Sequence, residues 1–249
     1  MRPSTTPNWI FTLPGKGPVE LDTLGDRVAF LHMPKTGGST LRGAIETGQA
    51  QGRFAEPALV LGHAARLQQA FHQLPGLRVV CTIRDPIARF VSGFYSRLRS
   101  GRPKFQLPWD AGEAAAFHWF AEAEELALAF ESPDERLKSA AWFAKSAIRH
   151  LRWDYPHYYL SADFVRRNAA RFAFVGEIGD LSTNLPRMLA HLGQREASEL
   201  PLHDTHRHAA PANARAGLSP QAEEILRRVL AADYEIYSAL QELSRQHAG

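Results

Sequence analysis

The chain contains almost no cysteine and no long apolar run, and both shortages restrict its class. Cys81 is the only cysteine among 249 residues, so no disulfide can form within the chain. We expect this residue, which lies in an apolar segment, to be buried in the core, and a lone cysteine fits a reducing compartment. The sequence has no stretch of about 18 apolar residues and no early apolar segment long enough for a signal peptide. We therefore expect a cytoplasmic protein with no membrane span.

The chain also has little excess of charge of either sign, because 29 Lys and Arg residues are nearly balanced by 26 Asp and Glu residues, which leaves a formal net charge of +3. A nucleic-acid-binding surface would require a denser basic stripe with interleaved aromatic residues, so we expect no nucleic-acid partner. Hydrophobic residues make up 45% of the chain, a value typical of a globular domain. We predict one domain over residues 1–249, with a loop-rich arm at 1–27 and a helical cap or insertion at about 105–155.

The most informative segment is residues 28–41, in which an apolar run ends at Pro34 and a helical pattern begins at Leu41. The residues between them are a lysine, two glycines and three hydroxyl residues: Lys35, Thr36, Gly37, Gly38, Ser39 and Thr40. Glycines let the backbone approach a ligand closely, and the N–H groups and dipole of a helix N-terminus attract an anion. The segment therefore predicts a phosphate-like ligand. Because the lysine precedes both glycines, it is not a Walker A loop.

A second strand, turn and helix follow at residues 77–95. The apolar run ends at Ile83, Asp85 is placed to cap the next helix, and Pro86 suits the first helical turn. Arg84 should then lie at the carboxyl end of the strand, where open α/β sheets bind ligands. We predict that Arg84 and Ser92 hold a second anion. The alternative is that Asp85 serves as a metal ligand after the strand.

These segments resemble the sulfotransferases that use 3′-phosphoadenosine-5′-phosphosulfate (PAPS). Residues 34–40 resemble their 5′-phosphosulfate loop, and residues 84–92 resemble their 3′-phosphate motif. The Pro-Lys-Thr-Gly-Gly order is similar to the carbohydrate branch, which includes the heparan and uronyl 2-O-sulfotransferases. Residues 172–178 and 233–237 also look like segments of this family.

The resemblance implies a P-loop-like, three-layer α/β fold with a central parallel sheet flanked by helices. The pattern itself predicts strands at 28–33, 59–63, 77–83 and 172–175 that alternate with helices, which favours a parallel sheet. A further short strand is predicted at 158–160. Long helices are predicted at 114–130, 136–151 and 219–245.

The chemistry implied is transfer of a sulfuryl group from PAPS to a hydroxyl, with release of 3′-phosphoadenosine-5′-phosphate (PAP). Lys35 would stabilise the charge on the leaving oxygen, and the scheme requires no metal. The proton of the acceptor requires a base, for which histidine is suited. We assign this role to His63, because the carbohydrate branch has a histidine after its second strand. The alternative bases are His32, His118, His157 and Glu56.

The acceptor is expected to be a small molecule or a glycan. We predict that His157 and Tyr158 line its site, and that Arg207, in a histidine-rich loop, lies near the 3′-phosphate. That loop also allows a metal site as an alternative interpretation. Two other functions remain open from the sequence: an ATP-dependent kinase, and a nucleotide-binding protein of the same fold without transfer activity.

Overall fold

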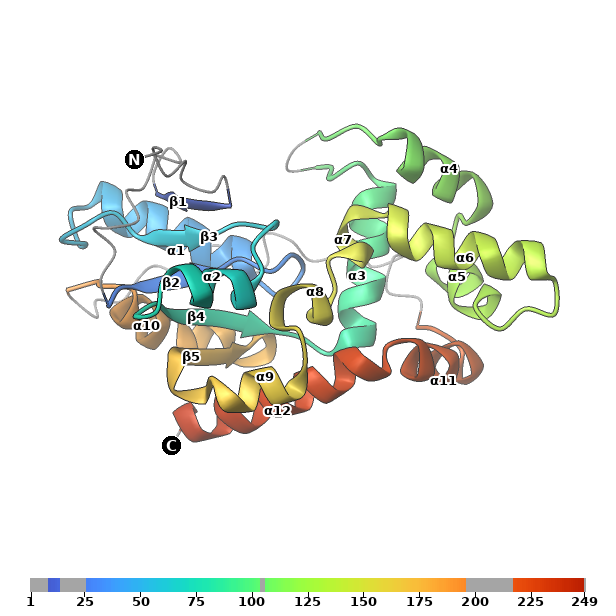
Figure 1. Cartoon of the computed structure of the whole chain (residues 1–249). Coiled ribbons are helices and arrows are strands. Elements are labelled where there is room, and N and C mark those ends of the chain that lie inside the picture. The colour runs from blue at the N-terminus through green and yellow to red at the C-terminus, as the bar shows by residue number, and fades with distance from the viewer. Residues whose placement is uncertain (1–8, 14–25, 104–105, 196–216, 249) are drawn as a thin grey trace, which may run out of the picture. The chain divides into compact units, whose positions relative to one another are not determined.

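The structure, a computed structural model, describes residues 9–13, 26–103, 106–195 and 217–248, which fall into two compact units (Figure 1). The sheet unit comprises the described residues up to Arg84, those from Tyr158 to 195, and those from Ile236 onward. The helical unit comprises Asp85–His157 and residues 217–235, and includes the described part of the predicted cap. None of the described helices combines the length and the apolar composition needed to cross a membrane.

The sheet unit is built on a five-stranded mixed sheet with the strand order β1-β3-β2-β4-β5. Its strands are β1 (Ile10–Thr12), β2 (Val28–Leu31), β3 (Leu59–Leu61), β4 (Arg78–Ile83) and β5 (Phe172–Glu177). Strands β2 to β5 are parallel, as the alternation of strands and helices predicts. β1 is an antiparallel edge strand inside the arm that the sequence predicts to be a loop. Three residues are too few for a strand pattern to stand out.

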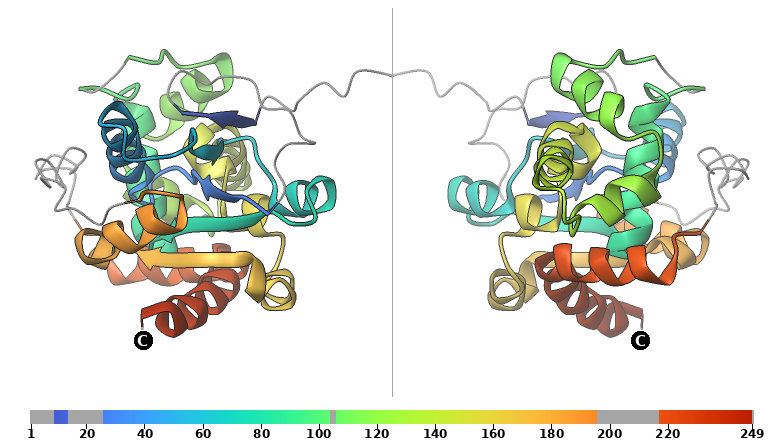
Figure 2. Two further views of the ribbon diagram at one scale, coloured as in Figure 1. Left: turned by 90° about the vertical axis from the view of Figure 1, so that its left-hand side faces the viewer. Right: turned by 90° about the vertical axis from the view of Figure 1, so that its right-hand side faces the viewer.

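Helices flank both faces of this sheet, as the left-hand view of Figure 2 shows. α1 (Gly38–Ala50) and α10 (Leu181–His191) lie against one face, and α2 (Leu67–Gln73) and α9 (Ala162–Arg167) lie at the other. The core of the first face joins apolar side chains of α1, α10 and the sheet: Leu41, Ile45, Leu185, Met188, Phe30, Val60, Val80 and Phe174. At the other, Phe71 of α2 contacts Phe164 of α9 and Phe172 of β5. Because helices cover both faces, the parallel strands are almost continuously apolar.

The helical unit has its own core. Its helices are α3 (Pro86–Leu98), α4 (Ala111–Trp119), α5 (Ala123–Ala129), α6 (Glu135–Ala147), α7 (Arg149–Arg152) and α11 (Pro220–Val229). The core residues include Phe90, Phe94, Phe120, Leu126, Phe130, Ile148, Leu151, Ile225 and Leu226. The helices predicted at 114–130 and 136–151 are each divided in two. A capping box between Glu122 and Glu125 starts α5, and an extended residue separates α6 from α7.

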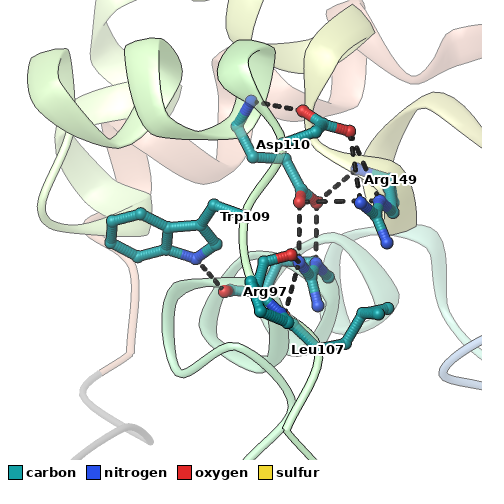
Figure 3. A network of polar contacts seen from close by, with 7 residues as sticks. Arg97, Leu107, Trp109, Asp110 and Arg149 are labelled. Atoms are coloured by element: carbon teal, nitrogen blue, oxygen red, sulfur yellow. Dashed lines mark hydrogen bonds and ion pairs between the residues drawn. The ribbon is translucent and has the colours of Figure 1, made fainter.

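A buried ion pair ties α3 to α4 within the helical unit (Figure 3). Arg97 is 1% exposed and Glu113 is 0% exposed, and both bonds from Nε and Nη2 of Arg97 to the carboxylate are 2.6 Å long. The carbonyl oxygen of Arg97 accepts the indole N–H of Trp109 at 2.7 Å. Beside them, Arg149 forms an ion pair with Asp110 at 3.4 Å. The buried charges therefore have close partners, which a low-dielectric interior requires.

Two further helices connect the units along the chain: α8 (Tyr155–Tyr159) and α12 (Ala231–Ala248). The predicted strand at 158–160 is wrong, because α8 ends there. Asp154 accepts the N–H of His157 at 3.1 Å, and Pro156 lies in the first turn of α8. An aspartate cap followed by a proline is a helix start, a signal that the aromatic residues of the segment obscured. The single helix predicted at 219–245 is likewise two helices, α11 and α12, separated at Leu230.

Candidate functional site

The segment between β2 and α1, residues 32–37, is called the lysine loop. The loop follows β2, from which the chain passes through α1 to β3 on one side of β2. On the other side of β2 lies β4, and from β4 the chain later reaches β5, farther away on that same side. Open α/β sheets bind ligands at such a switch point, outside the carboxyl ends of the strands. Arg84 follows β4, and its Nη1 donates a hydrogen bond to the carbonyl oxygen of Lys35 at 3.3 Å. Arg84 and the lysine loop, predicted separately from the sequence, therefore meet at one edge of the sheet.

Thr36 anchors the lysine loop to the sheet. Its side chain is fully buried, and its hydroxyl donates to the carbonyl oxygen of Met33 at 3.1 Å. The same hydroxyl lies 2.9 Å from that of Thr82 on β4. The hydroxyl predicted to face an anion is therefore directed into the fold instead. A contribution from the main-chain N–H of Thr36 stays a prediction.

The lysine loop also contains two residues in the left-handed backbone region. Lys35 has a φ of 71° and Gly37 a φ of 91°. For a lysine this conformation costs on the order of 1–3 kcal/mol, and such residues cluster at binding and catalytic sites. At Gly37, an added Cβ would also lie 3.0 Å from Cδ2 of Leu181 in α10. Position 37 therefore requires glycine both for its backbone conformation and for its packing.

The N-terminus of α1 begins where the lysine loop ends. Its N-cap residue is Gly37, so no described side chain caps the helix, and its first turn contains no acidic residue. The N–H groups of Gly38 and Ser39, together with the helix dipole, suit this end of α1 to an anion. Ser39 and Thr40 are half-buried in the same turn. A ligand that supplies acceptor oxygens takes the place of a capping side chain, so glycine at the N-cap is compatible with an anion site.

His63 lies on the turn after β3, beside the lysine loop. Its Nδ1 is 2.8 Å from the carbonyl oxygen of His32, and the centroids of the two rings are 4.6 Å apart. Because a carbonyl oxygen only accepts, Nδ1 carries the hydrogen and the lone pair of the neutral ring is on Nε2. A general base acting through Nε2 requires this tautomer. The ring of His32 in turn lies on Gly38, where an added Cβ would be 2.4 Å from Cδ2 of His32.

The alternative bases have different surroundings. His32 forms part of the support of His63, through its carbonyl and its ring. Glu56 is a largely exposed side chain that forms an ion pair with Arg27 at 3.6 Å. His118 is exposed on α4, and His157 is half-buried in α8, both within the helical unit. The hydrogen bond that fixes the tautomer of His63 favours His63 among these residues.

The other predicted site residues have three outcomes. Ser92 is half-buried on α3 in the helical unit, and it and His157 stay predictions as ligand contacts. Arg207 lies outside the described residues. Tyr158 is 1% exposed, and its hydroxyl donates to the carbonyl oxygen of His63 at 2.8 Å. The structure thus gives Tyr158 a buried partner in the His63 turn instead of the acceptor-facing position predicted.

Two polar residues near the carboxyl ends of β4 and β5 were not singled out from the sequence. Thr82 holds the hydroxyl of Thr36, as described above. Glu177 ends β5, in register with Ile83 of β4, and lies 3.3 Å from the donors Tyr237 Oη and Gln241 Nε2. A polar residue near the end of an otherwise apolar strand is the signal that could have identified both positions.

Two predictions near the site are confirmed. Asp85 caps α3, because Oδ1 accepts the N–H of Ala88 and Oδ2 accepts the hydroxyl of Tyr234, both at 2.9 Å. Cys81 is buried on β4, and this burial raises the pKa of its thiol to about 12. With both oxygens of Asp85 engaged, its alternative interpretation as a metal ligand loses support. Within the described ranges, no three His, Cys, Asp or Glu side chains are grouped to hold a metal ion.

Comparison of this chain with protein-family models, with curated proteins and with solved structures finds no match. An assignment of function therefore depends on the chemistry of the lysine loop, Arg84 and the His63 turn.

Proposed function

We propose that the protein is a PAPS-dependent sulfotransferase that acts on a hydroxyl of a carbohydrate or of a glycosylated small molecule. The observation that supports this most is the hydrogen bond between Arg84 and the carbonyl oxygen of Lys35. It joins two candidate anion-binding groups at the switch point of the sheet, where a nucleotide with phosphate groups at both ends could bridge them.

The residues of the site fit the two ends of such a substrate. The ammonium group of Lys35 and the N–H groups of Gly38 and Ser39 suit the 5′-phosphosulfate end. The guanidinium group of Arg84 suits the 3′-phosphate, with Ser92 and Arg207 as further predicted contacts. Lys35 would also stabilise the negative charge that develops on the leaving phosphate oxygen.

The reaction proposed is a direct transfer with a histidine base. Nε2 of His63 accepts the proton of the acceptor hydroxyl, and the acceptor oxygen forms a bond to sulfur. The bond between sulfur and the bridging phosphate oxygen breaks, and its electron pair leaves with that oxygen as PAP is released. By analogy with phosphoryl transfer, positioning and electrostatics would account for most of the rate.

Thermal unfolding separates this proposal from the kinase alternative. We expect PAP without magnesium to raise the melting temperature, because a ligand at 100 times its Kd stabilises the folded state by about 2.7 kcal/mol. A shift with magnesium ATP and none with PAP would favour a kinase. A shift with PAP but no transfer of labelled sulfate to glycans, lipids or phenols would favour a binding protein without transfer activity.

Substitution of Lys35 tests the transfer step itself. We expect Lys35→Ala to lower the rate of transfer by about 100-fold or more, with a smaller loss of PAP affinity, because the charge it stabilises develops in the transition state. The matched control is Lys138→Ala on α6 of the helical unit, which should transfer at the wild-type rate. A Lys35→Ala rate close to that of the control would refute the role of Lys35.

A further inference from the structure

The turn that carries His63 is held at several points by segments that are distant in sequence. The N–H of Gly62 donates to the carbonyl oxygen of Trp9 at 2.7 Å, and the ring of His63 is bound to the carbonyl oxygen of His32 at 2.8 Å. The hydroxyl of Tyr158 donates to the main-chain carbonyl oxygen of His63 itself, also at 2.8 Å. One of these contacts fixes the ring, and the other two fix the backbone that carries it.

Tyr158 is suited to hold a backbone rather than to bind a ligand. Its side chain is 1% exposed, and its ring lies 6.4 Å from that of Tyr159, centroid to centroid. Tyr159, its neighbour on α8, is equally buried, and its ring stacks on that of Phe172 in β5, with 6.3 Å between the centroids. The two adjacent tyrosines therefore have different surroundings in the sheet unit, and of the two it is Tyr158 whose hydroxyl bonds to His63 in the described contacts.

We propose that Tyr158 is a positioning residue for His63, an inference that rests on the proposed sulfotransferase function. Its hydroxyl holds the carbonyl of His63, so that Nδ1 of the ring keeps its hydrogen bond to His32 and Nε2 keeps its orientation. A turn free to shift would let the Nδ1 bond lengthen and the two tautomers mix. A displacement of about 1 Å in a reacting group can cost about 100-fold in rate. The effect of Tyr158 is therefore on the rate of the chemical step and not on substrate binding.

The experiment compares the full-length wild-type protein with Tyr158→Phe, which removes one hydroxyl and keeps the buried ring. Tyr159→Phe is the matched control, because it removes an equally buried hydroxyl from the same helix. Three readouts apply: kcat and KM for PAPS across pH, the melting shift with PAP, and the ring ¹⁵N shifts of labelled histidines. The signals of His63 are identified as those that are missing from the spectrum of His63→Gln.

In Tyr158→Phe we expect kcat to fall by about 10-fold while KM for PAPS stays within about twofold and the PAP shift is unchanged. The difference between the two ¹⁵N shifts of His63 should narrow, because the tautomers mix. In Tyr159→Phe, kcat and the His63 shifts should match the wild type. 4-Aminophenylalanine at position 158 retains a hydrogen-bond donor, so it should return kcat and the His63 shifts toward their wild-type values.

If Tyr158→Phe matches Tyr159→Phe in kcat and in the His63 spectrum, the positioning role of Tyr158 is overturned. Loss of the folded state in Tyr158→Phe would also overturn it, because the hydroxyl would then support the whole fold. If the wild type neither binds PAP nor transfers sulfate, the proposed function fails. The His63 spectra of the two variants would still decide whether Tyr158 positions His63.

Discussion

Gly38 and Gly43 lie on the same helix, α1, yet their surroundings differ. An added Cβ at Gly38 would lie 2.4 Å from Cδ2 and 2.9 Å from Nε2 of His32. At Gly43, no described atom lies within 4 Å of that position. The first glycine is therefore a packing requirement of the site, whereas the second is a helix residue that lacks a side chain.

Alanine at these two positions should have opposite effects on stability. We expect Gly38→Ala to lower the free energy of unfolding by about 1–3 kcal/mol, because the ring of His32 must move. Gly43→Ala should raise it by about 0.5–1 kcal/mol, because alanine is the better helix former. Urea denaturation measures both changes. A Gly38→Ala protein as stable as the wild type would contradict the close packing of His32 on α1.

At the scale of elements, two histidines connect the edge strand β5 with α10 and α12. The N–H of Val175 on β5 donates to Nδ1 of His247 at 3.2 Å, and the rings of His191 and His247 both lie 5.7 Å from that of Phe174. Burial lowers the pKa of both histidines, and the positive charge of Arg187 lowers them further. Both rings are therefore held in the neutral form, which His247 needs to accept a hydrogen bond.

This arrangement makes stability depend on pH in a defined direction. Between the lowered pKa of the folded protein and the ordinary pKa of 6.5, the unfolded chain binds more protons. The stabilisation that comes from keeping these two histidines neutral is therefore complete above pH 6.5 and is lost as the pH falls below 6.5. We expect the urea midpoint to decrease from pH 7 to pH 5, and the double variant His191→Gln, His247→Gln to lose part of this dependence. An identical slope in the double variant would exclude these two groups.

Arg171 closes the carboxyl end of α2. Its guanidinium donates to the carbonyl oxygens of Phe71, Leu74 and Leu77, at 3.2, 2.6 and 3.0 Å, and lies 3.8 Å from the ring centroid of Phe71. The carbonyls of Phe71 and Leu74 lie at the end of α2, where no further helical turn supplies a donor, and a planar fork of donors can reach both of them and that of Leu77.

Lysine cannot replace this fork. We expect Arg171→Lys to destabilise the protein by about 1.5–3 kcal/mol and to speed amide exchange in residues 67–77. Arg167→Lys on α9, where the side chain is exposed, should stay within about 0.5 kcal/mol of the wild type. Equal effects of the two substitutions would show that the three carbonyl contacts contribute little.

At the scale of the whole molecule, each unit has an apolar core cluster of its own among the described residues. The chain enters the helical unit after Arg84 and returns to the sheet unit at Tyr158, so β4 and β5 are joined through it. The ion pair of Arg97 and Glu113 lies entirely within the helical unit. Chains with two cores often unfold in more than one step.

Removal of the Glu113 charge should therefore weaken one unit before the other. We expect Glu113→Gln to lower the stability of the helical unit by about 3–5 kcal/mol, because Arg97 would stay buried without its counter-charge. Hydrogen exchange should rise in residues 85–157 and less in β2 to β5. The control Glu135→Gln changes a side chain that is 80% exposed and should have little effect. A uniform rise across both units would mean that the chain unfolds cooperatively.

The sequence by itself determined the local features of this protein. The strand, loop and helix at residues 28–41, the cap at Asp85 and the burial of Cys81 follow from apolar runs, capping residues and glycines that are neighbours in the chain. It also brought together the segments of the candidate site, because parallel strands place their carboxyl ends at one edge of the sheet. The cap at Asp154 shows that a local signal can still be misinterpreted when aromatic residues surround it.

Only the tertiary structure decided which atoms meet. Thr36 and Thr82 are 46 residues apart, Lys35 and Arg84 are 49 residues apart, and Tyr158 and His63 are 95 residues apart. No local pattern specifies such contacts, because they depend on the order of strands in the sheet and on the path of the chain between them. The inward hydroxyl of Thr36 and the partner of Tyr158 were therefore not predictable, although both residues were singled out.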